Sequence, residues 1–313
     1  MRRHLTYSLA LSLAVLFGLS GAASADNKLK AVASFSVLGD MVKQVGGDRV
    51  EVTTLVGPNG DAHVFNPTPA IAKLLASADI FFVNGLGFEG WMERLEKSSG
   101  FKGEVVVASK GVTPLTMGEE DGHHHDDHGD DHDEGGDEVP DPHAWQSLAN
   151  GKIYVANIRD GLITADPAGK AEYVANATKY LAAIDAEEAA VKVAIAKLPP
   201  ERRRIITSHD AFGYLADAYG LEVISPEGVS TESEASAQDV AMIIRQIREE
   251  QIPAVFLENV TDRRLLDQIA RETGAKIGGV LYSDALSKAD GPAPTYLGMF
   301  RHNIGALSAA LSS

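Results

Sequence analysis

Apolar and polar positions along this chain switch repeatedly between a strand-like and a helix-like pattern. Short apolar runs of four to seven residues occupy 30–35, 50–56, 79–84 and 103–108 in the first half, and 204–208, 221–224, 254–258 and 276–281 in the second. Between them lie segments with helical periodicity, at 36–42, from 68 onward, and at 150–163, 212–219, 238–250 and 295–310. Strands that alternate with helices predict βα units and parallel sheets. We therefore expect an α/β protein with two lobes.

One segment differs from this alternation. Residues 169–198 are rich in Ala, Glu and Lys, and neither Gly nor Pro interrupts them after Gly169. Their high helix propensity predicts one long helix, which Pro199 and Pro200 end. Such a helix can simply belong to a core, but its place between two runs of βα units favours a rigid connector. The expected organisation is a first lobe at 26–165, a connecting helix at 166–198 and a second lobe at 199–313.

The first 25 residues have the pattern of a secretory signal. Arg2 and Arg3 precede an apolar stretch from Leu9 to Leu19, and Ala23-Ser24-Ala25 offers a small-residue cleavage site. A membrane anchor needs about 20 apolar residues, whereas Ser12 and Gly18 interrupt this run. We expect cleavage before Asp26 and export to the periplasm.

Charge is concentrated in one place. The 313 residues carry a formal charge of −16, and twelve acidic residues lie between Glu119 and Asp141. Outside that stretch and the signal, 26 basic residues face 32 acidic ones. Because no basic surface is evident, nucleic acid is an unfavourable partner. The chain contains no cysteine, which excludes disulfides, thiolate metal sites and a lipid-anchored N-terminal cysteine.

The acidic stretch is also rich in histidine. Residues 119–138 hold five imidazoles, those of His123, His124, His125, His128 and His132. A run this polar cannot bury enough apolar surface to order itself, so it predicts a surface loop. A solvated linker is the simpler alternative. Imidazole binds borderline transition metals at neutral pH, and five in ten residues favour a loop that collects metal weakly. Zinc bound there should be lost below about pH 6.

Outside the signal and the loop, three histidines occupy positions that ligands favour. His63 lies in a turn rich in Gly and Pro after a strand, His209 follows a strand directly, and His143 opens the segment after the loop. Asp284 follows the strand at 276–281. Ligands of parallel α/β sheets bind at the carboxyl ends of strands. Each residue alone can equally cap a helix or satisfy a buried polar group, and spacing does not prove a joint site. We interpret His302 as structural or solvent-facing.

At these residues the chain resembles a known family. Asp61-Ala62-His63, Asp141-Pro142-His143-Ala144-Trp145, Ser208-His209-Asp210 and Tyr282-Ser283-Asp284 are similar to the metal-binding motifs of the zinc and manganese solute-binding proteins of ABC transporters, family 9, of the ZnuA and AztC type. The resemblance covers essentially the whole mature chain. It implies two α/β lobes joined by a rigid helix, the cluster A-I architecture, with a metal between the lobes and delivery to a membrane permease and its ATPase.

The resemblance also implies the ligands. Carried over position by position, they are His63, His143, His209 and Asp284. Manganese-type relatives usually have Glu at the third position, where this chain has His209, and three imidazoles with one carboxylate suit Zn²⁺ better than Mn²⁺. Some zinc relatives use a glutamate at the position of Ala62, so Asp284 is the expected fourth ligand. A His-rich insertion is typical of the zinc branch.

Four functions remain in view. The preferred one is an exported, monomeric protein that captures Zn²⁺ for an importer, because four protein ligands leave no position for an activated water. A manganese-binding protein of the same class is the nearest alternative. A zinc buffer or periplasmic chaperone would depend on the loop alone. A zinc hydrolase would need three ligands and a base such as Glu258 or Asp210, and the chain has no HExxH pair. We therefore predict a protein that is not an enzyme, with a periplasmic zinc chaperone as a further possible partner.

Overall fold

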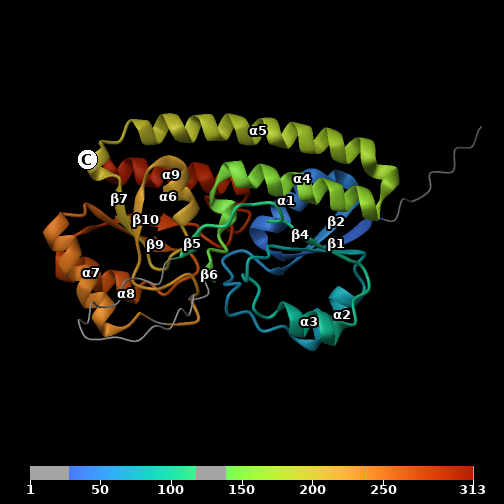
Figure 1. Cartoon of the computed structure of the whole chain (residues 1–313), viewed down its shortest axis with the longest axis horizontal. Coiled ribbons are helices and arrows are strands. Elements are labelled where there is room, and N and C mark those ends of the chain that lie inside the picture. The colour runs from blue at the N-terminus through green and yellow to red at the C-terminus, as the bar shows by residue number, and fades with distance from the viewer. Residues whose placement is uncertain (1–27, 118–138, 234, 313) are drawn as a thin grey trace, which may run out of the picture.

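The computed structural model describes residues 28–117, 139–233 and 235–312, and it consists of two α/β lobes beneath a layer of long helices (Figure 1). The export signal and the five loop histidines lie outside the described residues. Within those residues, no helix is both long enough and apolar enough to cross a membrane.

The first lobe is built on a parallel sheet of four strands in the order β2-β1-β3-β4. The strands are β1 (Leu29–Phe35), β2 (Val50–Val56), β3 (Ile80–Val83) and β4 (Glu104–Val107). Helices α1 (Ser36–Gly46), α2 (Pro69–Ala76), α3 (Met92–Ser99) and α4 (Leu148–Ala165) complete it. The sequence predicted all four strands. It also predicted the start of α2, where the Thr68 hydroxyl accepts a hydrogen bond from the amide of Ile71.

The second lobe repeats this plan with a parallel sheet in the order β10-β9-β7-β8. Its strands are β7 (Arg204–Ile206), β8 (Glu222–Ile224), β9 (Ala254–Glu258) and β10 (Lys276–Leu281). Its helices are α6 (Gly213–Tyr219), α7 (Ala237–Glu250) and α8 (Arg264–Thr273). A second apolar cluster, built from β9 and the isoleucines of α7 and α8, fills the space between this sheet and the two helices.

Helix α5 (Lys170–Ala196) runs along one side of both lobes, and α9 (Tyr296–Leu311) lies beside it over the second lobe (Figure 1). The α5 residues that face the molecule recur every three or four positions: Tyr173, Ala177, Tyr180, Ile184, Glu187, Val191 and Ile195. They pack against α1, α4 and α9. The long helix expected from the sequence is therefore present, and it is also part of the core, since the main apolar cluster includes residues of both lobes and of α5.

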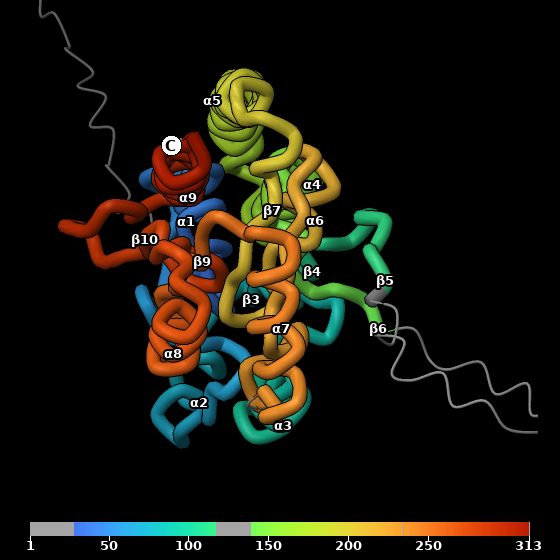
Figure 2. Tube along the Cα trace, turned by 90° about the vertical axis from the view of Figure 1, so that its left-hand side faces the viewer, coloured from blue at the N-terminus to red at the C-terminus, as the bar shows by residue number. Residues whose placement is uncertain are grey.

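Besides the short 3-10 helices, two helices and one pair of strands were not predicted. Helices α3 and α8 are short and strongly amphipathic, and their polar residues hide the helical pattern. The strands form an antiparallel pair, β5 (Thr116–Met117) with β6 (Val139–Pro140), in which Met117 lies opposite Val139. Figure 2 shows this pair projecting from one side of the molecule. It brings together the two ends of the segment that contains the loop histidines.

Candidate metal centre

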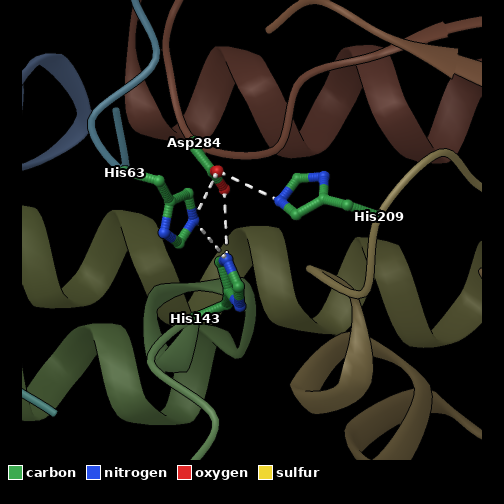
Figure 3. Close-up of side chains that lie close together, drawn as sticks. All are labelled: His63, His143, His209 and Asp284. Atoms are coloured by element: carbon green, nitrogen blue, oxygen red, sulfur yellow. Dashed lines mark hydrogen bonds and ion pairs between the residues drawn. The ribbon is translucent and has the colours of Figure 1, made fainter. Parts of the chain in front are cut away.

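Four residues far apart in the sequence meet between the lobes. His63 lies on the turn after β2, and His143 immediately precedes the short 3-10 helix η2 (Ala144–Gln146). His209 lies between β7 and α6, and Asp284 follows β10. All four are buried, with exposed fractions of 8%, 0%, 0% and 1% in chain order. Figure 3 shows their side chains converging on one point.

Four of the six donor pairs have separations close to those around a tetrahedral ion. His63 Nε2 lies 3.3 Å from His143 Nε2 and 3.3 Å from Asp284 Oδ2. Asp284 Oδ2 lies 3.1 Å from His209 Nε2, and Asp284 Oδ1 lies 3.6 Å from His143 Nε2. Zinc bonds of about 2.0–2.1 Å at tetrahedral angles place ligand atoms about 3.3 Å apart. One donor atom from each residue lies within 4.8 Å of every other.

The backbone before two of the histidines is fixed in the same way. The amide of His63 donates to Asp61 Oδ1 at 2.9 Å, and the amide of His143 donates to Asp141 Oδ1 at 2.8 Å. Both pairs have the sequence Asp-X-His. A short carboxylate that accepts from the amide two residues later closes a tight turn, which directs each imidazole away from its own backbone.

Buried carboxylates hold the remaining nitrogen of two imidazoles. His143 Nδ1 lies 2.8 Å from Asp141 Oδ1, and His209 Nδ1 lies 2.7 Å from Glu258 Oε2. Glu258 also accepts the amides of Ser208 and His209 through Oε1, at 2.8 and 2.9 Å. A carboxylate on Nδ1 fixes the tautomer that leaves Nε2 free for a metal.

Aromatic side chains enclose the imidazoles. The ring centroid of Phe88 lies 4.8 Å from that of His63, and the ring of Trp145 lies 5.3 Å from that of His143. Both aromatic residues are almost completely buried. The Trp145 indole nitrogen donates to the carbonyl of Ser283 at 3.0 Å, next to Asp284. The centre is thus shielded from water, which strengthens electrostatic interactions inside it.

Asp284 and His209 shift each other's pKa in the centre. Burial alone would raise the pKa of Asp284, but the nearby His209 and His143 lower that pKa well below its usual value. Burial alone would lower the pKa of His209, but the charges of Glu258 and Asp284 raise that pKa well above its usual value. Without metal, a proton on His209 therefore balances the carboxylates. A divalent cation in the centre would replace that proton.

The sequence predicted the four converging residues but not the partners that orient them. The sequence offers Asp141 only as part of a motif and Glu258 only as a candidate base of a hydrolase. The signal was present in the repeated Asp-X-His spacing and in Glu258, which ends an otherwise apolar strand. His302 lies apart, as expected, and its Nε2 donates to the carbonyl of Val280 at 2.8 Å.

The surroundings do not suit hydrolysis. Glu258 is occupied by His209 and two amides. Asp210 is not among the residues whose donor atoms converge, although burial, and then the charge of Asp141, raise its pKa to about 6. Four converging donors complete a tetrahedral zinc and leave no open position for an activated water. The arrangement can bind an ion and release it again.

Relatives of this chain bind several metals. The manganese-binding lipoprotein MntA of Halalkalibacterium halodurans is 32% identical over 91% of this chain and 89% of its own length. The iron-binding protein YfeA of Yersinia pestis is 33% identical over 93% of this chain and 91% of its own length.

Solved structures of metal-binding proteins share the fold of this chain. The periplasmic zinc-binding protein TroA of Treponema pallidum superposes with a TM-score of 0.82 at 30% identity, covering 91% of this chain and 99% of its own. A manganese-bound periplasmic metal-binding protein of Candidatus Liberibacter asiaticus gives 0.78 at 33% identity, covering 91% and 100%. Residues 31–310 match the family described as zinc-uptake complex component A, periplasmic. The chain therefore belongs to this family of metal-binding, non-enzymatic solute-binding proteins of ABC transporters.

Proposed function

We propose that this protein captures Zn²⁺ in the periplasm through His63, His143, His209 and Asp284 and delivers it to an ABC importer. The observation that carries the proposal is the convergence of four buried donors, with four of the six donor pairs 3.1 to 3.6 Å apart and all pairs within 4.8 Å. Those distances fit a small tetrahedral ion held by nitrogen and oxygen.

The composition of the centre favours zinc over manganese. Three imidazoles and one carboxylate give a nitrogen-rich set, whereas Mn²⁺ prefers more oxygen ligands and a higher coordination number. Glu258 strengthens the preference, because its carboxylate on His209 Nδ1 makes that imidazole a better donor. The names of the relatives include manganese, iron and zinc, so the metal of this chain has to be measured.

Each residue around the centre then has a role in holding the ion. Asp141 and Glu258 orient two imidazoles, and Asp61 fixes the backbone of the third. Asp284 supplies the charge that a neutral imidazole cage would lack. The indole and phenyl rings around the imidazoles exclude water, so that exchange with solvent requires the lobes to separate.

The remaining parts of the proposal concern partners and location. Solute-binding proteins of this family work with a permease and an ATPase in the membrane. We propose that the five loop histidines bind further zinc weakly, and that the protein acts as a monomer that can receive metal from a periplasmic chaperone. Cleavage of residues 1–25 and the absence of a lipid anchor stay predictions.

Metal titration of chelator-treated protein tests the proposal. Wild-type protein should bind one Zn²⁺ tightly and prefer it to Mn²⁺. His143→Ala and His209→Ala should each weaken that binding by about two orders of magnitude or more, because a buried ligand is lost. His302→Ala is the matched control, since His302 contacts only Val280 and Tyr282. Tight zinc binding by both ligand variants, or a preference for Mn²⁺, would overturn the assignment.

A further inference from the structure

The crossover segment, residues 282–295, leaves the second sheet after β10, carries Asp284 and leads into α9. Because β10 belongs to the second lobe, chain order assigns Asp284 to that lobe together with His209. The hydrogen bonds of the crossover segment instead attach Asp284 to the first lobe.

Both sides of Asp284 are bound to the first lobe. The carbonyl of Ser283 accepts from Trp145 Nε1 at 3.0 Å and from Gln146 Nε2 at 2.8 Å. The amide of Leu286 donates to Ser36 Oγ at 2.9 Å, and its carbonyl accepts from the amide of Asn59, also at 2.9 Å. Three of these four partners are buried side chains of the first lobe.

The far end of the crossover segment is bound to the same lobe. Where α9 begins, the amide of Tyr296 donates to Asp40 Oδ2 on α1 at 2.9 Å. The Tyr296 hydroxyl donates to the carbonyl of Trp145 at 2.7 Å. From Ser283 to its end at α9, the segment is therefore bound to surfaces of the first lobe. Only afterwards does α9 return to pack against β10.

Contacts between the crossover segment and the second lobe are fewer. Asn259, after β9, accepts from the amide of Ser283 at 3.3 Å and donates to the carbonyl of Ala285 at 3.1 Å. The same amide group of Asn259 also donates to Asn59 of the first lobe at 3.2 Å. On the sheet side, one partly exposed side chain thus opposes a set of mostly buried ones. The buried Asn303 of α9 holds Tyr282, at the start of the segment, by accepting from its amide at 2.9 Å and donating to its carbonyl at 2.8 Å.

His209 shows the opposite pattern. Its amide and its Nδ1 are both held by Glu258, and its backbone forms a bridge with Glu227. The next amide, that of Asp210, donates to the carbonyl of Gly228. All of these partners belong to the second lobe. Apart from the other ligands, the described polar contacts of His209 and its amide stay within that lobe.

We infer that the centre divides three to one: His63, His143 and Asp284 form a preassembled half-site on the first lobe, and His209 is the single ligand that the second lobe brings. This inference rests on the proposed function. Separation of the lobes would withdraw one imidazole and leave two imidazoles and the carboxylate in place. The half-site keeps its negative charge, so it is where an incoming Zn²⁺ binds first and from which it finally leaves.

Opening of this kind breaks few polar contacts between the lobes. Thr231 donates to Asp61 Oδ2 at 2.6 Å beside the centre. The Tyr214 hydroxyl donates to the carbonyl of Asp141 at 2.9 Å and accepts from the amide of Leu115 at 3.1 Å. Each is a contact of a single side chain. Because the crossover segment would stay with the first lobe, opening also breaks the hydrogen bonds of Asn259 to Ser283, Ala285 and Asn59.

Distances between spin labels test the grouping, and the absence of native cysteine makes the labelling specific. Nitroxides are placed in pairs at three exposed positions: Lys73→Cys on α2, Arg271→Cys on α8 and Lys288→Cys in the crossover segment. Pulsed electron paramagnetic resonance then compares zinc-loaded with metal-free protein, and elemental analysis checks the loading.

On zinc removal, the 73–271 and 271–288 distances should shift together by more than about 2 Å, the scale of a domain rearrangement, while the 73–288 distance stays unchanged. A fixed 271–288 distance with a shifted 73–288 distance would overturn the inference, and so would three fixed distances. The proposed function fails separately: if the labelled proteins take up no zinc, it is wrong. In that case the metal-free protein still tests whether the crossover segment moves with the first lobe. Two labels on one rigid body give a narrow distance distribution, so the 73–288 distribution should then be narrower than the 271–288 distribution.

Discussion

At the scale of single residues, the ligands of this centre are inseparable from the carboxylates behind them. Asp141 and Glu258 each contact the Nδ1 of a ligand histidine within 2.8 Å and are themselves buried. Burying two acids next to Asp284 is costly unless positive charge compensates for it. The cost is met by protonated imidazole in the free protein and by the cation in the bound one. The fold thus places three buried carboxylates at the proposed Zn²⁺ site.

Glu258→Gln should therefore weaken zinc binding without removing a ligand. The amide can still accept from Ser208 and His209, but it supplies no negative charge to His209 Nδ1. We expect the affinity for Zn²⁺ to fall between about 10-fold and about 100-fold, the usual effect of losing such a partner. Competition with a chromophoric chelator measures it. Glu201→Gln, at an exposed position in the same lobe, is the control, and equal affinities for both variants would disprove the role.

At the scale of elements, the ends of strands position the converging residues, and the junction between α4 and α5 positions the long helix. Connections after β2, β7 and β10 place His63, His209 and Asp284 at the carboxyl edges of the two sheets, and His143 comes from the segment between β6 and η2. The junction of α4 with α5 fixes how the long helix lies on the first lobe. There Asp166 Oδ2 accepts from Arg49 Nη2 at 2.8 Å and from the Tyr173 hydroxyl at 2.7 Å.

This junction should make stability depend on pH. Burial alone would raise the pKa of Asp166, but the hydrogen bonds from Tyr173 and Arg49 outweigh it and lower that pKa. A lowered pKa stabilises the fold above the unfolded value of about 3.9, and the effect disappears as pH falls through the folded value. Asp166→Asn should cost about 0.5–1 kcal/mol at pH 7, a small figure because the site is partly screened by solvent, and progressively less as pH falls below the unfolded value.

Urea unfolding of both proteins across this pH range measures the difference. Asp160→Asn is the matched control, because Asp160 is an exposed acid on α4 that contacts the neighbouring Arg159. If the free energy of unfolding of Asp166→Asn differs from that of wild type by the same amount from pH 7 to pH 2, the ionised carboxylate does not contribute to stability.

At the scale of the whole molecule, none of the four converging residues belongs to the histidine-rich segment. Its ends leave the fold at β5 and β6, where Met117 and Val139 already lie opposite each other. Residues 118–138 can therefore be replaced by Asn-Gly, the pair that favours a two-residue hairpin turn. The centre itself gives up no ligand in this replacement.

We expect the shortened protein to keep one tightly bound Zn²⁺ and to lose any weaker zinc that the wild type binds. Isothermal titration at pH 7 and at pH 5.5 separates the two classes, because only the weak class should already be absent from wild type at the lower pH. Unchanged stoichiometry after the replacement would refute an accessory role for the segment. Loss of the tight site would instead support a protein that acts as a buffer.

Local periodicity, which a linear chain displays directly, predicted the alternation of strands and helices and the long helix. Side-chain chemistry and position made the four converging residues candidates, and the family resemblance supplied their grouping as one set of ligands. The sequence did not show α3 or α8, because short helices with many polar residues gain their stability from packing.

Only the tertiary structure decided which side chains act together. His63 and Asp284 are separated by 221 positions in the sequence, yet their donor atoms are 3.3 Å apart. The attachment of Asp284 to the first lobe depends on Ser36, Trp145 and Gln146, none of which signals a metal site. Hydrogen bonds between distant segments have no local pattern, so chain order assigned Asp284 to one lobe while its contacts anchor it to the other.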